Sequence, residues 1–182
     1  VLPATDDEGD AVVGVAPSAF TKKGLTSVQF PTGMMVDYND TVTNGKVTKR
    51  GNFVIGENAF SGNELTSVTL PEGVIACLSN SFRGNKITTV KLPKTIWWLE
   101  TQSFGRNLIT TVNFPTTCDF QLEMHGMAFA NNLITSVRLP DYTEVVNKDS
   151  FFWNPGKEPL ANEAPDKYKS YTGVDGETHT AG

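Results

Sequence analysis

The stretch from Ile55 to Pro71, IGENAFSGNELTSVTLP, decides the fold of this chain. Its last seven residues place apolar side chains at Leu65, Val68 and Leu70, with polar β-forming residues between them. The spacing apolar-x-x-apolar-x-apolar is typical of the short strand in a repeat protein. The proline that follows ends the strand, because proline cannot donate a hydrogen bond to a sheet.

The same stretch recurs in register along the chain, with a phenylalanine as its anchor. The anchors are Phe20, Phe60, Phe82, Phe104, Phe129 and Phe151. Three of the gaps are 22 residues long, one is 25 and one is 40, so the unit has about 22 residues and the array carries two insertions. Asparagine stands three residues after the anchor at Asn63, Asn85, Asn107 and Asn132, with Lys23 as the exception. Proline ends each strand segment at Pro31, Pro71, Pro93, Pro115 and Pro140.

A fixed period of this length predicts a solenoid, because one unit cannot bury its own apolar face but stacked units can. We expect the phenylalanines to form a spine and the asparagines to bond the backbone of neighbouring turns. A second apolar column lies five residues before each anchor, at Val15, Ile55, Cys77, Leu99, Met124 and Val146. Between this column and the phenylalanine we expect a short helical or 3₁₀ turn. The predicted fold is an α/β repeat solenoid of the leucine-rich type, right-handed, with about five to six turns and one short strand per turn.

The solenoid is predicted to span residues 12–153, after an N-terminal arm over residues 1–11. Residues 154–182 lose the pattern and are expected to form a C-terminal cap or a linker tail, since prolines and glycines break regular structure there. The longer insertion, residues 32–53, contains Asn44-Gly45 between β-forming residues, which predicts a hairpin. This hairpin is either a binding loop or a cap, and a cap is favoured because terminal repeats usually need one.

Composition excludes several classes of function. The net charge is −5 and the longest basic run is Lys49-Arg50, whereas nucleic-acid binding needs a basic patch. No apolar run reaches about 18 residues, so we expect no membrane insertion. The two cysteines do not make a disulfide framework. Residues 1–10 are small and acidic and do not resemble an export signal.

The chain shows no pattern of catalytic residues. No Ser-His-Asp order, glycine-rich phosphate loop or carboxylate pair is visible. The histidines, His125 and His179, stand in no metal-ligand spacing. We therefore predict a protein that is not an enzyme and has no catalytic residue, metal or cofactor.

Strand alternation predicts which residues face outward and are free to bind. One outward column is nearly uniform and hydroxylic, whereas the other varies and is weakly basic. The variable column, on the expected concave strand face, is Gln29, Thr69, Lys91, Asn113 and Arg138. It predicts a site for an acidic protein or a glycan, the alternative being a merely solvated face. Trp98 and Trp153 are further candidate contacts, because an exposed indole stacks on a sugar or anchors a partner protein, unless both are packed inside.

The repeat resembles the BspA-like class of bacterial leucine-rich repeats, whose unit combines Leu-x-x-Ile-x-Leu-Pro with Val-x-x-Ile-Gly-x-x-Ala-Phe. The best matches are residues 65–71 and 55–60, and the resemblance covers residues 12–151. The Gly of Ile-Gly appears only at Gly56, so the other repeats diverge at that bend. The family is similar to adhesins and surface-displayed binding proteins and implies no shared catalytic residues.

The resemblance implies a binding or adhesion module of a cell-surface or secreted bacterial protein that contacts a host or matrix protein. One alternative is a structural spacer within a larger surface protein. Another is a carbohydrate-binding module, which needs Trp98 or Trp153 exposed beside polar groups.

Overall fold

The computed structural model describes residues 1–3, 5, 7–8, 12–31, 42–43, 46–47, 53–118, 120–147, 149–155, 170–172 and 178–180. A six-stranded parallel sheet contains β1 (Gly14–Val15), β4 (Phe53–Ile55), β6 (Val74–Cys77), β8 (Trp98–Leu99), β10 (Leu122–Met124) and β11 (Thr143–Val146). A three-stranded parallel sheet contains β5 (Ser67–Thr69), β7 (Thr89–Lys91) and β9 (Thr111–Asn113). Two antiparallel pairs join β2 (Val42–Thr43) to β3 (Lys46–Val47), and β12 (Ser170–Thr172) to β13 (Thr178–Thr180).

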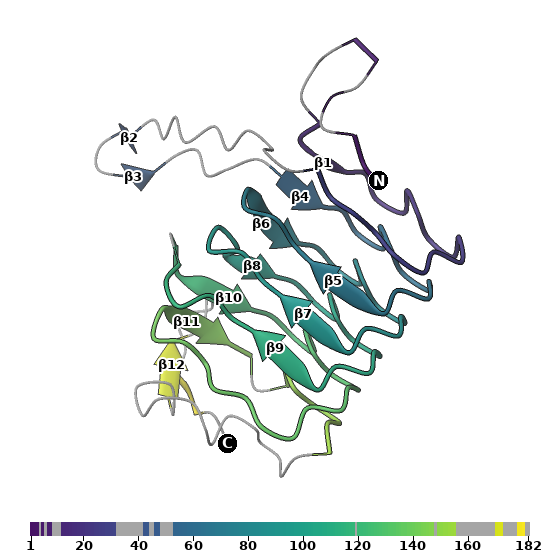
Figure 1. Ribbon diagram of the computed structural model, residues 1–182. Helices are drawn as coiled ribbons and strands as arrows, with labels where there is room; N and C mark the ends of the chain where they lie inside the picture. The colour runs from purple at the N-terminus through teal and green to yellow at the C-terminus, as the bar shows by residue number, and fades with distance from the viewer. Residues whose placement is uncertain are drawn as a thin grey trace.

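The chain winds as a parallel solenoid, with its turns stacked one on the next (Figure 1). Each strand pairs with the equivalent strand one repeat later, as Val68 does with Val90 and Val90 with Val112. The predicted leucine-rich repeat solenoid is therefore confirmed.

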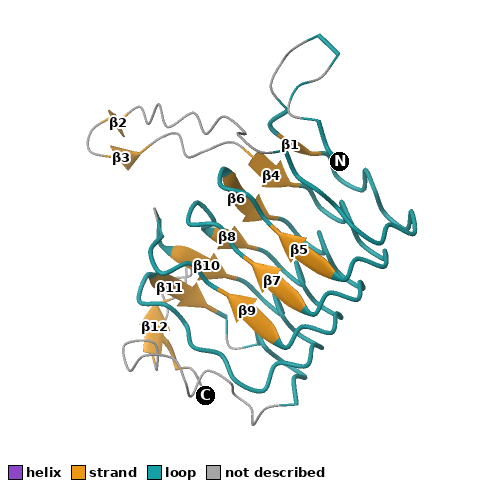
Figure 2. Ribbon diagram, in the orientation of Figure 1, coloured by secondary structure: helices purple, strands orange, loops and turns teal. Residues whose placement is uncertain are grey.

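The helical part of the prediction is not confirmed, and the central turns contain two short strands each instead of one. Figure 2 shows strands and loops but no helix in the part of the chain that the structure describes. The second apolar column, expected to lead into a helical turn, lies in the six-stranded sheet instead. The turn after β4 is closed by two tight bonds, from Ala59 N to Gly56 O and from Ser61 N to Asn58 O.

Left-handed backbone explains why no helix forms beside each phenylalanine. Two residues before the anchor, φ is positive at Ser18, Asn58, Asn80, Gln102 and Met127. Two residues after it, φ is positive at Lys22, Gly62, Gly84, Arg106, Asn131 and Trp153. A right-handed helix cannot run through a left-handed residue. A positive φ at the third position is instead what a type II turn requires.

The six anchor phenylalanines form the predicted spine. Ring centroids of successive phenylalanines are 5.1 to 5.5 Å apart, and their planes differ by 6° to 10°. Phe60, Phe82, Phe104 and Phe129 are fully buried in the single core cluster. Stacking at this distance adds to the free energy gained from burial alone.

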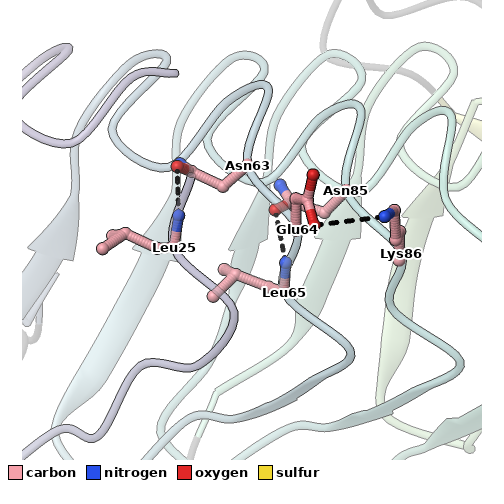
Figure 3. A network of polar contacts seen from close by, with 6 residues as sticks. All are labelled: Leu25, Asn63, Glu64, Leu65, Asn85 and Lys86. Carbon is pink, nitrogen blue, oxygen red and sulfur yellow. Dashed lines mark hydrogen bonds and ion pairs between the residues drawn. The ribbon is translucent and has the colours of Figure 1, made fainter. Parts of the chain in front are cut away.

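The asparagine column lies beside the spine and joins each turn to the one before it (Figure 3). The Asn63 Oδ1 accepts from Leu25 N at 3.1 Å, and its Nδ2 donates to the carbonyls of Phe20 and Phe60, both at 2.8 Å. The same pattern is repeated by Asn85, Asn107, Asn132 and Asn154. These asparagines satisfy buried backbone groups that the tight turns leave open.

Two segments lie against the ends of the stack. At the first repeat, Leu2 packs against the core and its N–H donates to Gln29 O at 2.9 Å. At the last repeat, β12 lies next to β11 (Figure 1). In the insertion, Val42 pairs with Val47 and Thr43 with Lys46. The predicted turn residues Asn44 and Gly45 lie outside the described residues.

Replacing Phe82 with alanine should lower the free energy of unfolding by about 3–5 kcal/mol, because it leaves a cavity between two stacked rings. Chemical denaturation measures the change. The matched control is Phe152→Ala, since Phe152 is 36% exposed outside the spine, and it should lose less than about 1 kcal/mol. Equal losses at both positions would show that the spine contributes no more than surface contacts.

Replacing Asn107 with leucine should destabilise the fold by about 1–3 kcal/mol, because it leaves the buried Ile87 N–H without its acceptor. The substitution also removes one of the two side-chain amides that donate to Phe82 O and to Phe104 O. The control is Asn113→Leu on exposed β9, which should lie within about 0.5 kcal/mol of the wild type. A loss below 1 kcal/mol at Asn107 in urea denaturation would contradict the structural role of this column.

Candidate functional site

The exposed face of β5, β7 and β9, here called the strand face, presents two columns of side chains. Alternation along each strand buries Val68 and Val90 and leaves their neighbours on the outer side. One column is Ser67, Thr89 and Thr111, and the other is Thr69, Lys91 and Asn113, each held in direct register by strand pairing.

The structure thus brings together three of the five residues predicted for this site. Gln29 and Arg138 occupy the equivalent positions of the first and fifth repeats and are also exposed, but both lie outside the described strands. No hydrogen bond joins Lys91 or Arg138 to another described side chain. Their charges are therefore available to a partner.

The strand face is rigid because the backbone beneath it is bonded from turn to turn. The Leu70 N–H donates to Lys91 O and the Leu92 N–H to Asn113 O, both at 3.1 Å. The Thr88 and Thr110 hydroxyls donate to carbonyls one turn earlier, each at 3.4 Å. Hydroxyl, amide and ammonium groups on such a frame hold a partner by hydrogen bonds and charge.

Trp98 is the first residue of β8 in the six-stranded sheet and is half-buried. Its ring centroid is 4.0 Å from that of His125 and 5.3 Å from that of Trp97. His125 Nε2 in turn lies 3.4 Å from Glu123 Oε2. One side of the Trp98 indole is therefore covered by protein, which reduces the area open to a ligand.

Trp153 is 56% exposed, and its ring centroid is 4.6 Å from that of Phe152. It lies two residues after the last anchor phenylalanine, in the turn that follows β11, whereas Trp98 lies within the six-stranded sheet. The two tryptophans are therefore not brought together in one site.

The cysteine Cys77 is buried rather than presented for chemistry. Burial raises the pKa of its thiol, which keeps the sulfur protonated. Cys77 and Cys118 are both free cysteines. Among the residues with described positions, no group of three or more His, Cys, Asp or Glu side chains is arranged to hold a metal ion.

Sequence analysis missed three exposed apolar residues beside the strand face. Leu108 and Leu133 occupy the same repeat position one turn apart and are 45% and 46% exposed. Phe152 lies one turn further along, where its carbonyl accepts from Asn131 N. The signal was present in the sequence, because the repeat position of Leu108 holds Glu64 and Lys86 in earlier turns.

A parallel solenoid with this leucine-rich strand is a leucine-rich repeat protein, a class whose fold is typically a non-enzymatic scaffold for binding. The BspA type leucine-rich repeat region matches the chain in six copies over residues 14–156. The chain therefore belongs to the BspA-type leucine-rich repeat family, as the resemblance predicted. No curated protein and no solved structure matches it. Within the described residues, we find no helix with the length and apolarity needed to cross a membrane.

The double substitution Lys91→Glu with Arg138→Glu should change the free energy of unfolding by less than about 1 kcal/mol, since both side chains are exposed. Urea denaturation of the double variant beside the wild type checks this. A loss above about 2 kcal/mol would assign the two charges to the fold instead of to binding.

Proposed function

We propose that the chain is a non-catalytic protein-binding module that recognises its partner through the strand face. The observation that carries this proposal is the contrast between the interior and the outer columns. Inside, phenylalanine and asparagine repeat at equivalent positions, whereas outside Thr69, Lys91 and Asn113 differ at directly paired positions. A rigid frame with a varied outer face is the form in which repeat proteins present binding surfaces.

We further propose that this module belongs to a bacterial cell-surface or secreted protein and contacts a host or matrix protein. Membership of the BspA-type family supports the surface location. The exposed side chains of the strand face support contact with a protein. They are hydroxyl and amide groups around a few charges, which are the groups found in polar protein interfaces.

Carbohydrate binding is the second candidate function, and the exposure of Trp153 favours it. Its indole projects beside Phe152 at the last repeat, and exposed aromatic rings stack on sugars. The covered side of Trp98 weighs against that residue as a second stacking platform.

The folded chain should bind at least one protein on an array of extracellular-matrix proteins and glycans. The Lys91→Glu, Arg138→Glu variant should bind that protein at least tenfold more weakly, which corresponds to about 1.4 kcal/mol. Lys94→Glu, which changes an exposed lysine away from the strand face, should bind as the wild type does.

Two other array results would contradict this proposal. A sugar that binds and quenches tryptophan emission would favour the carbohydrate module. If neither a protein nor a glycan on the array binds, the result would favour a structural spacer without a ligand of its own.

A further inference from the structure

The charged side chains of the repeat region are sorted by their position in the repeat. Residues 12–31, 53–118, 120–147 and 149–155 contain eight cationic and eight anionic side chains. We define the basic band as the nine positions that follow each anchor phenylalanine, as far as the structure describes them. The band holds seven of the cations, Lys22, Lys23, Arg83, Lys86, Lys91, Arg106 and Arg138, and one anion, Glu64. Its formal charge is therefore 7 − 1 = +6.

The remaining positions carry the opposite charge. They hold one cation, Lys94, and seven anions, Glu57, Glu72, Glu100, Glu123, Asp141, Glu144 and Asp149. Their formal charge is 1 − 7 = −6, so the zero net charge of these described ranges hides two oppositely charged sets of positions. A linear search for basic runs does not find this band, because its cations are brought together only by stacking.

The band occupies the same stretch of each repeat. It begins on the loop after each phenylalanine and continues onto the strand face, which includes Lys91. Arg83 and Arg106 belong to adjacent turns, as the bond from Gly84 N to Gly105 O shows, and adjacent strands are about 4.8 Å apart. Six of its seven cations are exposed, and Arg83 is half-buried with Nε donating to Gln102 Oε1 at 2.6 Å.

The single anion of the band does not offset its charge. Glu64 pairs with Lys86 at 3.2 Å (Figure 3), and both side chains are solvent-exposed. Such a pair contributes at most about 1 kcal/mol. Like charges held close together repel one another and weaken the fold. A binding partner of opposite charge would relieve this repulsion.

Exposed apolar residues lie within the same band, near its C-terminal end. Leu108 is two residues from Arg106, and Leu133 follows one turn later. Phe152 and Trp153 extend this apolar group into the last repeat. Aromatic and apolar anchors surrounded by charged groups are typical of protein interfaces. A sulfated polysaccharide offers no side chain to cover leucines.

We propose that the basic band docks an acidic polypeptide segment, with an apolar side chain of that segment packed against Leu108, Leu133 and the Phe152–Trp153 pair. This inference rests on the proposed protein-binding function and adds the chemistry of the partner. The carboxylates of the segment pair with the band cations, and the acidic remainder of the solenoid repels the same segment from every other approach.

A random peptide library displayed on phage and panned against the folded chain tests this proposal. Enriched peptides should combine Asp or Glu with Leu, Phe or Trp. A labelled peptide of that kind should bind more than tenfold more weakly when NaCl is raised from about 50 to 500 mM, because the screening length shortens.

Matched variants locate the site. Lys91→Glu with Arg106→Glu should weaken the labelled peptide at least tenfold, and Leu108→Ser several-fold, in fluorescence anisotropy. Lys94→Glu, the same change at an exposed cation outside the band, should leave its affinity unchanged. Circular dichroism of each variant confirms that it is folded. If the band variants bind as the wild type does, the location is wrong.

The remaining outcomes separate this proposal from the proposed function. Enrichment of basic or uncharged peptides would contradict the proposal of an acidic partner. The proposed function as a protein-binding module would still stand. If no peptide is enriched while heparin binds through the band, both proposals fail in favour of a sulfated polysaccharide. If sedimentation at low salt shows self-association that the band variants abolish, the band docks the acidic side of another copy, and the separate partner is excluded.

Discussion

The fold depends on the hydrogen bonds that each buried asparagine makes with two turns at once. A tight corner beside every phenylalanine leaves that residue's carbonyl, and an amide at the start of the next strand segment, pointing into the core. In water-free surroundings such groups each weaken the fold by about 1–3 kcal/mol if they stay unpaired. One carboxamide satisfies both kinds of group, as Asn85 does for Phe60 O, Phe82 O and Leu65 N. This contact fixes the distance between turns and so stacks the phenylalanine rings.

Because the interior is fixed in this way, length changes are accommodated elsewhere. The extra three residues between Phe104 and Phe129 leave those rings 5.4 Å apart, and the long insertion before Phe60 leaves it 5.3 Å from Phe20. Both insertions lie between the proline that ends one repeat's strand segment and the next strand of the six-stranded sheet, away from the asparagine column. The outer face therefore varies in sequence without disturbing the frame that carries it.

Periodicity predicted the features that are forced to repeat by burial: the spine, the asparagine column and the alternation on the strand face. Periodicity did not predict the local structure correctly where the same apolar spacing fits more than one backbone conformation. An apolar residue five positions before phenylalanine suits either a helix or a strand followed by a turn. The left-handed residues that decide between them include Ser18, Gln102 and Met127, which carry no glycine-like signal. Asn154 was missed because it follows the irregular aromatic run Phe151-Phe152-Trp153, although it closes the last turn as its equivalents do.

The candidate site was predictable as columns but not as an electrostatic surface. Lys91 and Arg138 stood out because they interrupt an otherwise neutral strand column, whereas Lys22, Arg83 and Arg106 lie in the turn directly after the phenylalanine, outside the strand pattern. Only the stacking of the turns brings these cations onto neighbouring turns, while most carboxylates stand at the other positions of the repeat. A partner with negative charge is then attracted by the basic band and repelled by the acidic positions. Specificity arises as much from that repulsion as from the contacts themselves.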